Sequence, residues 1–134
     1  MAKEGESGLV AVADSFSKEL GLEMVRTGKG ECVLSLKIAK KHLNRSGIAH
    51  GGVLLAALDT CMGASVVTTL TEGEWAATIQ VNAQFLEKCV EGDSLSIEAK
   101  VLRRGKRFAF VEGAVMNSGK LACKASGEWV ISSK

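Results

Sequence analysis

The sequence predicts an α+β domain in which an antiparallel sheet of about six strands wraps around one long central helix. The helix is indicated by the run from Gly51 to Leu70, which contains one charged residue and is apolar on nearly every side. The strands are indicated by alternating apolar and polar residues. Because tight turns join successive strands, they are expected to pair antiparallel, and such a sheet can enclose a helix.

The individual elements follow from periodicity and turn signals. Apolar residues recur at helical spacing up to Leu20, and Gly21 can end that N-terminal helix. Further along, alternation places Ile79 and Val81 on one face of a strand and Thr78 on the other. In chain order, the sequence predicts a helix over residues 8–20, strands over 22–27 and 31–38, a loop over 39–49, the buried helix over 51–70, and strands over 76–86, 94–103, 108–116 and 121–131.

Size and composition predict one soluble globular domain over residues 1–134. The net charge of +2 is too small to favour a nucleic-acid partner. The apolar run from Val53 to Leu70 is near the lower length limit for crossing a bilayer, but Asp59 and several hydroxyl residues interrupt it. We therefore expect a helix buried in a protein core and no membrane span.

The cysteines indicate a reducing environment. There are four of them, at widely spaced positions with no Cys-x-x-Cys pair, and only two histidines accompany them, so no metal site is expected. The sequence opens without an apolar signal region. Together these features predict a cytoplasmic protein, or one from another reducing intracellular compartment.

The most informative residue is Asp59, the lone carboxylate of the long apolar run. An ionised carboxylate buried without a partner is costly, so such a group has either a raised pKa or a functional reason for its charge. The run opens with His50-Gly51-Gly52, and free N–H groups at a helix start attract negative charge. A carboxylate combined with an anion site favours hydrolysis of an acyl compound. The structural alternative is a carboxylate satisfied by a hydroxyl such as that of Thr60 or Thr78.

These residues form a pattern that resembles a known family, the hotdog-fold acyl-CoA thioesterases of the phenylacetate-degradation type, the 4-hydroxybenzoyl-CoA thioesterase-like branch. The similarity extends from Phe16 to Ile131. The segments that carry it are Asn44-x-x-Gly47-x-x-His50-Gly51-Gly52, then Asp59, Thr78-Ile79-Gln80-Val81-Asn82, Gly92-Asp93 and Arg104-Gly105-Lys106. Glu87-Lys88-Cys89 departs from the pattern, because relatives often carry a proline there.

The resemblance implies a hotdog fold and hydrolysis of acyl-CoA thioesters without a metal. CoA would be part of the substrate, so no cofactor is expected. The resemblance gives Asp59 the role of nucleophile or general base and gives the Gly51 N–H the role of polarising the thioester carbonyl. The residues matched by Asn44 and His50 would place the thioester and the attacking water, and Thr78 would lie beside Asp59. Homodimers, often in pairs, are the expected assembly.

The spacing of the two reactive groups supports a shared site. Gly51 and Asp59 lie eight residues apart, which is roughly 12 Å along a helix. One thioester carbonyl cannot accept from that N–H and be within attack range of the same chain's carboxylate. If both groups act on one substrate, they come from different subunits of a homodimer. Such a dimer would also cover open sheet edges.

The remaining candidates carry weaker signals. His50 is as well explained by a bond to the helix start as by substrate contact, and His42 is expected at the surface. Gly52 is a further candidate for substrate binding, although glycine also permits close helix packing. Asn82 is expected to bind substrate or to lie in an interface rather than to catalyse. Cys61 has no evident base and is expected to be a small buried residue.

A basic cluster lies in the turn between the fourth and fifth strands. It comprises Arg103, Arg104, Lys106 and Arg107, with Gly105 among them. Solvated hairpin turns are often basic, but the cluster also suits the phosphates of CoA. We favour the second interpretation, with Lys106 and Arg107 as the main phosphate contacts and Arg104 and Gly105 as further substrate-binding residues.

Two other functions compete with hydrolysis. A hydratase or dehydratase acting on acyl thioesters would need a histidine as proton shuttle, so its activity would depend on His50 rather than on Asp59. A non-catalytic module would bind acyl-CoA tightly, as an oligomer, without turning it over. Release of free thiol from a panel of acyl-CoA substrates, compared between wild type and Asp59→Ala, separates these alternatives.

Overall fold

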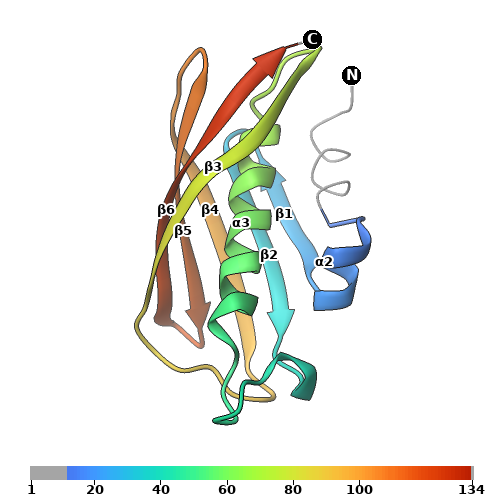
Figure 1. Cartoon of the computed structure of the whole chain (residues 1–134), viewed down its shortest axis with the longest axis vertical. Helices are drawn as coiled ribbons and strands as arrows, with labels where there is room; N and C mark the ends of the chain where they lie inside the picture. The colour runs from blue at the N-terminus through green and yellow to red at the C-terminus, as the bar shows by residue number, and fades with distance from the viewer. Residues whose placement is uncertain (1–11, 134) are drawn as a thin grey trace.

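A computed structural model describes residues 12–133 and shows an antiparallel sheet curved around one long helix (Figure 1). The sheet has six strands in the order β1-β2-β4-β5-β6-β3. The long helix α3 lies in the curve of this sheet, and the short helix α2 lies beside the β1 side. The elements are α2 (Ser15–Leu20), β1 (Glu23–Gly28), β2 (Glu31–Lys37), the 3-10 helix η1 (Lys40–His42), α3 (Gly51–Val67), β3 (Glu74–Phe85), β4 (Ser94–Arg104), β5 (Phe108–Asn117) and β6 (Lys120–Ser133).

The predicted α+β hotdog architecture is thus confirmed. Every predicted strand is present, and most boundaries agree within a few residues. The N-terminal helix begins later than expected among the described residues, at Ser15, because the Asp14 side chain caps it by accepting from the Ser17 N–H at 3.0 Å. Gly21 ends this helix with a φ of 88°, as predicted. Residues 8–11 of the predicted helix lie outside the described residues.

Two glycines bring α3 close to the sheet. A Cβ atom on Gly113 of β5 would lie 2.9 Å from the Met62 sulfur, and one on Gly127 of β6 would lie 2.8 Å from the ring of Trp129. The missing side chains make room for Met62, which is fully buried. This contact fixes the height and rotation of α3 above the sheet, and therefore the positions of the polar groups that it carries.

The two edges of the sheet differ in character. At one edge, β1 is six residues long, has a register shift between Met24 and Arg26, and carries charged residues. At the other edge, β3 is twelve residues long and carries no charge from Trp75 to Phe85. Short, bulged and charged edges resist pairing with another strand, whereas long uncharged edges favour it. The structure therefore leaves β3 as the edge suited to pairing.

A bulge in β3 corrects one prediction from alternation. The register with β6 shifts between Thr78 and Gln80, so the side-chain alternation changes phase at Ile79. Thr78 consequently faces α3 rather than the opposite side, while Val81 packs against the core. Ile79 is 48% exposed rather than buried with Val81. The predicted face assignment for Thr78 and Ile79 was wrong because a bulge leaves no signature in apolar–polar alternation.

The sheet wraps α3 as predicted, but in a single protomer one side of the helix is only partly covered. The sheet covers the face that includes Leu58 and Met62, both fully buried. The opposite side is only partly covered, with Leu55 and Val67 each 37% exposed. We call this side the uncovered stripe of α3; its residues are Gly52, Leu55, Asp59, Gly63 and Val67.

Asp59 is therefore half-buried rather than enclosed in an apolar core. Among the described residues, no helix is long and apolar enough to cross a membrane.

The helix–sheet contact generates a stability prediction. In Gly127→Ala, the new methyl group would meet the Gln80 carbonyl oxygen at 2.7 Å as well as the Trp129 ring. We expect overpacking to lower the free energy of unfolding by about 1–3 kcal/mol. The matched control is Ser126→Ala on the exposed side of β6, which should change it by less than about 0.5 kcal/mol. Urea denaturation measures both variants, and equal stabilities would contradict the packing role of Gly127.

Candidate active site

The carboxylate of Asp59 lies at the middle of the uncovered stripe, and Thr78 of β3 lies opposite it. The Thr78 hydroxyl donates to Asp59 Oδ1 at 2.8 Å. The bulge that follows Thr78 turns this hydroxyl toward α3. Asp59 and Thr78 line one hollow, and its lining also includes Thr60, Gly63, Val67 and Trp129. An oriented half-buried carboxylate beside an open hollow can receive a proton or attack an electrophile.

The first turn of α3 leaves one N–H group free. His50 is the N-cap, and its Nδ1 accepts from the Gly52 N–H at 2.9 Å. The Val53 N–H donates to the His50 carbonyl at 2.9 Å. Within residues 12–133, the Gly51 N–H has no acceptor. The cap therefore uses the Gly52 N–H and leaves that of Gly51 available, at the positive end of the helix dipole.

The hydrogen bonds of His50 also define its chemistry. Because Nδ1 accepts, the ring proton resides on Nε2, and His50 has no ring nitrogen left to act as a base in this arrangement. Its side chain is exposed, so the Nε2–H remains able to donate to a ligand. The sequence suggested that His50 bonds to the start of the helix, and the structure contains that bond.

His42, expected at the surface, is buried with 3% exposure, and that prediction was wrong. Its Nδ1 accepts from the Ala39 N–H at 2.8 Å, and its Nε2 contacts the Leu20 carbonyl at 2.7 Å. Its own carbonyl accepts from the His50 N–H at 2.8 Å. His42 therefore joins the end of α2 to the loop that presents the start of α3.

Asn44 shapes the loop that precedes α3. Its Oδ1 accepts from the Ser46 N–H at 2.9 Å, and the Asn44 N–H donates to the Ile48 carbonyl at 2.8 Å. This side-chain turn brings Asn44 beside Gly51. A second hollow is lined by Asn44, Ile48, Ala49, Gly51, Leu54, Phe85, Leu86, Glu87, Lys88 and Cys89.

Phe85 contacts this second hollow and is a residue that sequence reasoning missed. A Cβ atom on Gly51 would lie 3.5 Å from its ring, and the Phe85 side chain is 51% exposed. An aromatic residue at the end of a strand is usually part of the core, so its sequence context gave no signal of this position.

The two hollows belong to separate parts of one protomer. Asp59 lines one and Gly51 lines the other, and none of residues 12–133 lines both. Both residues lie in the continuous helix α3, so about 12 Å of helix axis separates them. One protomer does not bring the carboxylate and the free N–H to the same reacting carbon.

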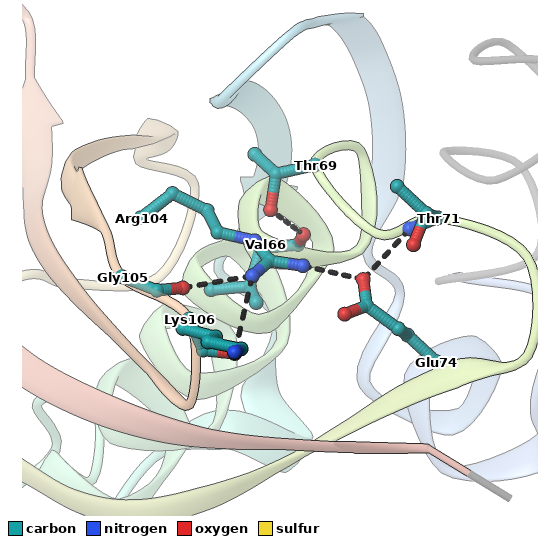
Figure 2. A network of polar contacts seen from close by, with 7 residues as sticks. All are labelled: Val66, Thr69, Thr71, Glu74, Arg104, Gly105 and Lys106. Atoms are coloured by element: carbon teal, nitrogen blue, oxygen red, sulfur yellow. Dashed lines mark hydrogen bonds and ion pairs between the residues drawn. The ribbon is translucent and has the colours of Figure 1, made fainter.

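In the basic turn, one cationic side chain is paired with a carboxylate and the other three are exposed. The guanidinium of Arg104 forms an ion pair with Glu74 and donates to the Gly105 carbonyl at 2.7 Å (Figure 2). Arg103, Lys106 and Arg107 are exposed. The Thr71 N–H bonded to Glu74, together with Arg104, holds the pKa of the Glu74 carboxyl below its usual value. Arg104 is therefore engaged within the protein.

Two other candidates lie away from both hollows. Asn82 is exposed on β3 and lies near Ser126 of the neighbouring strand.

Cys61 is fully buried, as predicted, and its thiol contacts the backbone carbonyls of Cys32 and Ile97. Burial raises the pKa of the Cys89 and Cys123 thiols. Among the described residues, no group of three or more histidine, cysteine and acidic side chains could hold a metal ion.

Comparison with known proteins identifies the family. The family model of the thioesterase superfamily matches residues 46–124, which include the start of α3, Asp59 and Thr78. The chain belongs to the thioesterase superfamily. A provisionally named esterase of Saccharolobus solfataricus, SSO2140, is 32% identical over 120 residues, covering 89% of this chain and 84% of that protein. The resemblance seen in the sequence is thereby confirmed.

Two further relatives bear on the ligand. Human acyl-coenzyme A thioesterase 13 is 27% identical over 112 residues, covering 81% of this chain and 79% of its own length. The solved structure of smu.793 from Streptococcus mutans, bound to acetyl-CoA, is 27% identical with a TM-score of 0.79. That match covers 84% of this chain and 90% of the Streptococcus chain. Thioesterase membership also confirms the predicted enzyme class, a thioester hydrolase.

The helix cap generates a prediction about His50. Replacing His50 with alanine removes the acceptor for the Gly52 N–H, and we expect the free energy of unfolding to fall by about 1 kcal/mol. His50→Asn places a good N-cap residue at the same position and should recover most of that loss. Chemical denaturation compares the two. Equal destabilisation by alanine and asparagine would show that the cap contributes little and that the ring itself matters.

Proposed function

We propose that the protein hydrolyses acyl-CoA thioesters at a site shared between two subunits, with Asp59 from one and the Gly51 N–H from the other. The observation that carries this proposal is that Asp59 and Gly51 line two separate hollows along one continuous helix. Thioesterase membership and the acyl-CoA relatives support the substrate class. No second function is favoured, since the cap bond of His50 argues against a histidine proton shuttle.

The homodimer in this proposal forms by pairing of β3 with its copy. The β3 edge is long and uncharged, and it lies beside the uncovered stripe through the bond between Thr78 and Asp59. A two-fold axis makes the paired strands antiparallel, so the two α3 helices also run in opposite directions. In this dimer, the start of each α3 helix lies toward the middle and the far end of the other α3 helix. A pair of such dimers is the further assembly that we expect.

The chemistry needs an ionised carboxylate and a fixed donor. As general base, Asp59 takes a proton from water while the water oxygen bonds to the carbonyl carbon; as nucleophile, it bonds to that carbon directly, and water later cleaves the anhydride. In either route the partner's Gly51 N–H stabilises the oxyanion. Breaking the C–S bond releases CoA thiolate, which takes up a proton, and the products are a free acid and CoA.

The surrounding residues have supporting roles in this proposal. Thr78 orients Asp59 through its hydroxyl. Asn44 has its Oδ1 committed to the loop, so its NH₂ group is the part available to the thioester. The exposed Nε2–H of His50 is a second available donor. The four free, buried cysteines suit a cytoplasmic or other reducing intracellular location.

Removal of the carboxylate tests the centre of the proposal. Asp59→Asn keeps the shape of the side chain but removes its charge, and we expect kcat to fall about 10²–10⁴-fold. The measurement is release of free thiol from a panel of acyl-CoA substrates by wild type, Asp59→Asn and Asp59→Ala. Turnover by either variant at the wild-type rate would remove Asp59 from the mechanism.

A matched pair of substitutions tests the Gly51 N–H. Proline suits the first position of a helix, and the extended backbone of His50 is compatible with a following proline. Gly51→Pro therefore removes the N–H while keeping the helix, and kcat should fall about 10²–10³-fold. Gly51→Ala retains the N–H and its Cβ has room at 3.5 Å from Phe85, so it should keep most activity. Equal activity of the two variants would exclude the donor role.

Subunit sharing has its own test. Mixing inactive Asp59→Asn with inactive Gly51→Pro, with exchange of subunits, gives mixed dimers that carry one intact site each. Random exchange should restore about one quarter of the wild-type activity. A site built from one protomer would stay inactive in every combination. Sedimentation at the assay concentration confirms that dimers are present.

A further inference from the structure

The ion pair between Arg104 and Glu74 closes one end of the curved sheet. Arg104 ends β4 and Glu74 begins β3, and two other strands separate β4 from β3 in the sheet. The pair therefore joins the two strands across the end of α3 rather than along the sheet (Figure 2). Both side chains are half-buried, at 23% and 19% exposure. We call this contact the Arg104–Glu74 latch.

The latch also shapes the turn that carries the free cations. One guanidinium nitrogen of Arg104 donates to the Gly105 carbonyl at 2.7 Å while the other binds Glu74. Glu74 is itself fixed by the Thr71 N–H at 2.8 Å. The Gly105 N–H donates to the Phe108 carbonyl at 2.8 Å, and a Cβ on Gly105 would approach that oxygen to 3.0 Å. A planar, forked group such as guanidinium can hold a carboxylate and a carbonyl together, whereas ammonium cannot fix both directions.

We propose that Arg104 is a positioning residue, which through Glu74 holds the turn so that Lys106 and Arg107 bind the phosphate groups of CoA. The inference rests on the proposed function, and it assigns Arg104 a different task from direct substrate contact. The charge of Arg104 is already matched by Glu74, whereas Lys106 and Arg107 are exposed. Free cations held on a fixed backbone suit the diphosphate or the 3′-phosphate.

The location of the turn agrees with the shared site. Arg104 pairs with Glu74, which in turn accepts from the Thr71 N–H four residues after the end of α3, so Arg104 lies at the end of α3 that is opposite to Gly51 (Figure 2). In a two-fold dimer through β3, the α3 helices run in opposite directions, so the partner's helix start approaches this end. The turn of one subunit thus lies on the side where CoA bound at the partner's Gly51 would leave the reaction centre.

A single substitution gives opposite results for the two roles of Arg104. Glu74→Gln removes the carboxylate that holds Arg104. If Arg104 contacts phosphate directly, this change frees a cation and CoA binds as tightly as before or more tightly. If Arg104 is a positioning residue, the turn loosens and the Kd for CoA rises by about tenfold, close to the loss of one phosphate contact. Titration of the dimeric protein with CoA measures this without requiring turnover.

The control removes the same charge without touching the latch. Glu72 is exposed two residues before Glu74, and it forms no hydrogen bond or ion pair with Arg104. Glu72→Gln should leave the Kd for CoA unchanged or slightly lower. Arg104→Lys keeps the charge but not the fork, and should raise the Kd as Glu74→Gln does. A Kd that is unchanged or falls in Glu74→Gln, or that is unchanged in Arg104→Lys, would overturn the proposal.

Substitution of the exposed cations tests the proposal in a second way, which does not depend on the stability of the latch. Lys106→Gln and Arg107→Gln should each raise the Kd for CoA, and adding Glu74→Gln to the double variant should have little further effect. In turnover, these changes should raise KM for an acyl-CoA with kcat unchanged and leave KM for the matching acyl-pantetheine unaffected. Titration with 3′-dephospho-CoA separates the 3′-phosphate from the diphosphate.

The two proposals fail in different ways. If Lys106→Gln and Arg107→Gln leave CoA binding unchanged, the phosphate role is wrong while the hydrolytic mechanism stands. If Asp59→Asn retains activity but the turn variants weaken CoA binding, the mechanism is wrong while the phosphate role stands.

Discussion

The close packing of α3 on the sheet is the contact on which the rest of the structure depends. Gly113 and Gly127 leave the space that Met62 fills, and this fixes how far and at which angle α3 lies above the strands. Asp59 and Gly51 are rigidly separated as a result, because both are carried by the same continuous helix. A loop could move to bring two groups together, but a helix packed in this way cannot. The subunit sharing that we propose therefore follows from the packing of the core.

The start of α3 shows how a loop selects one N–H from several. His50 engages the Gly52 N–H, and the His50 carbonyl engages that of Val53, so the Gly51 N–H remains. The loop is in turn held by the buried His42. An oxyanion donor needs a fixed direction more than it needs strength, because reorientation during the reaction would lose the benefit. His50 and His42 thus hold the start of α3 and the loop that precedes it through these bonds.

The sequence was sufficient for the fold because hydrophobic periodicity and glycine turns are local signals. The strands and the long helix were predicted from such patterns and are present in the structure. The bulge at Ile79, which turns Thr78 toward Asp59, could not be read because one extra residue leaves the composition unchanged. Burial of His42 depends on Leu20, twenty-two residues away. The pairing of Arg104 with Glu74 depends on how the sheet curves, since their strands are not neighbours.

A second copy of the chain, paired through β3, would cover both the open edge of β3 and the uncovered stripe of α3. Both the β3 edge and the stripe expose surface that favours contact with another protein chain, and both lie on the side where the Thr78 hydroxyl bonds to Asp59. A copy that pairs with β3 would cover this side and bring a second helix start toward the carboxylate. The opposite edge, β1, is protected by its shortness, its bulge and its charges. Assembly through β3 would thus bury the stripe and complete the site in the same step, which links the stability of the dimer to its chemistry.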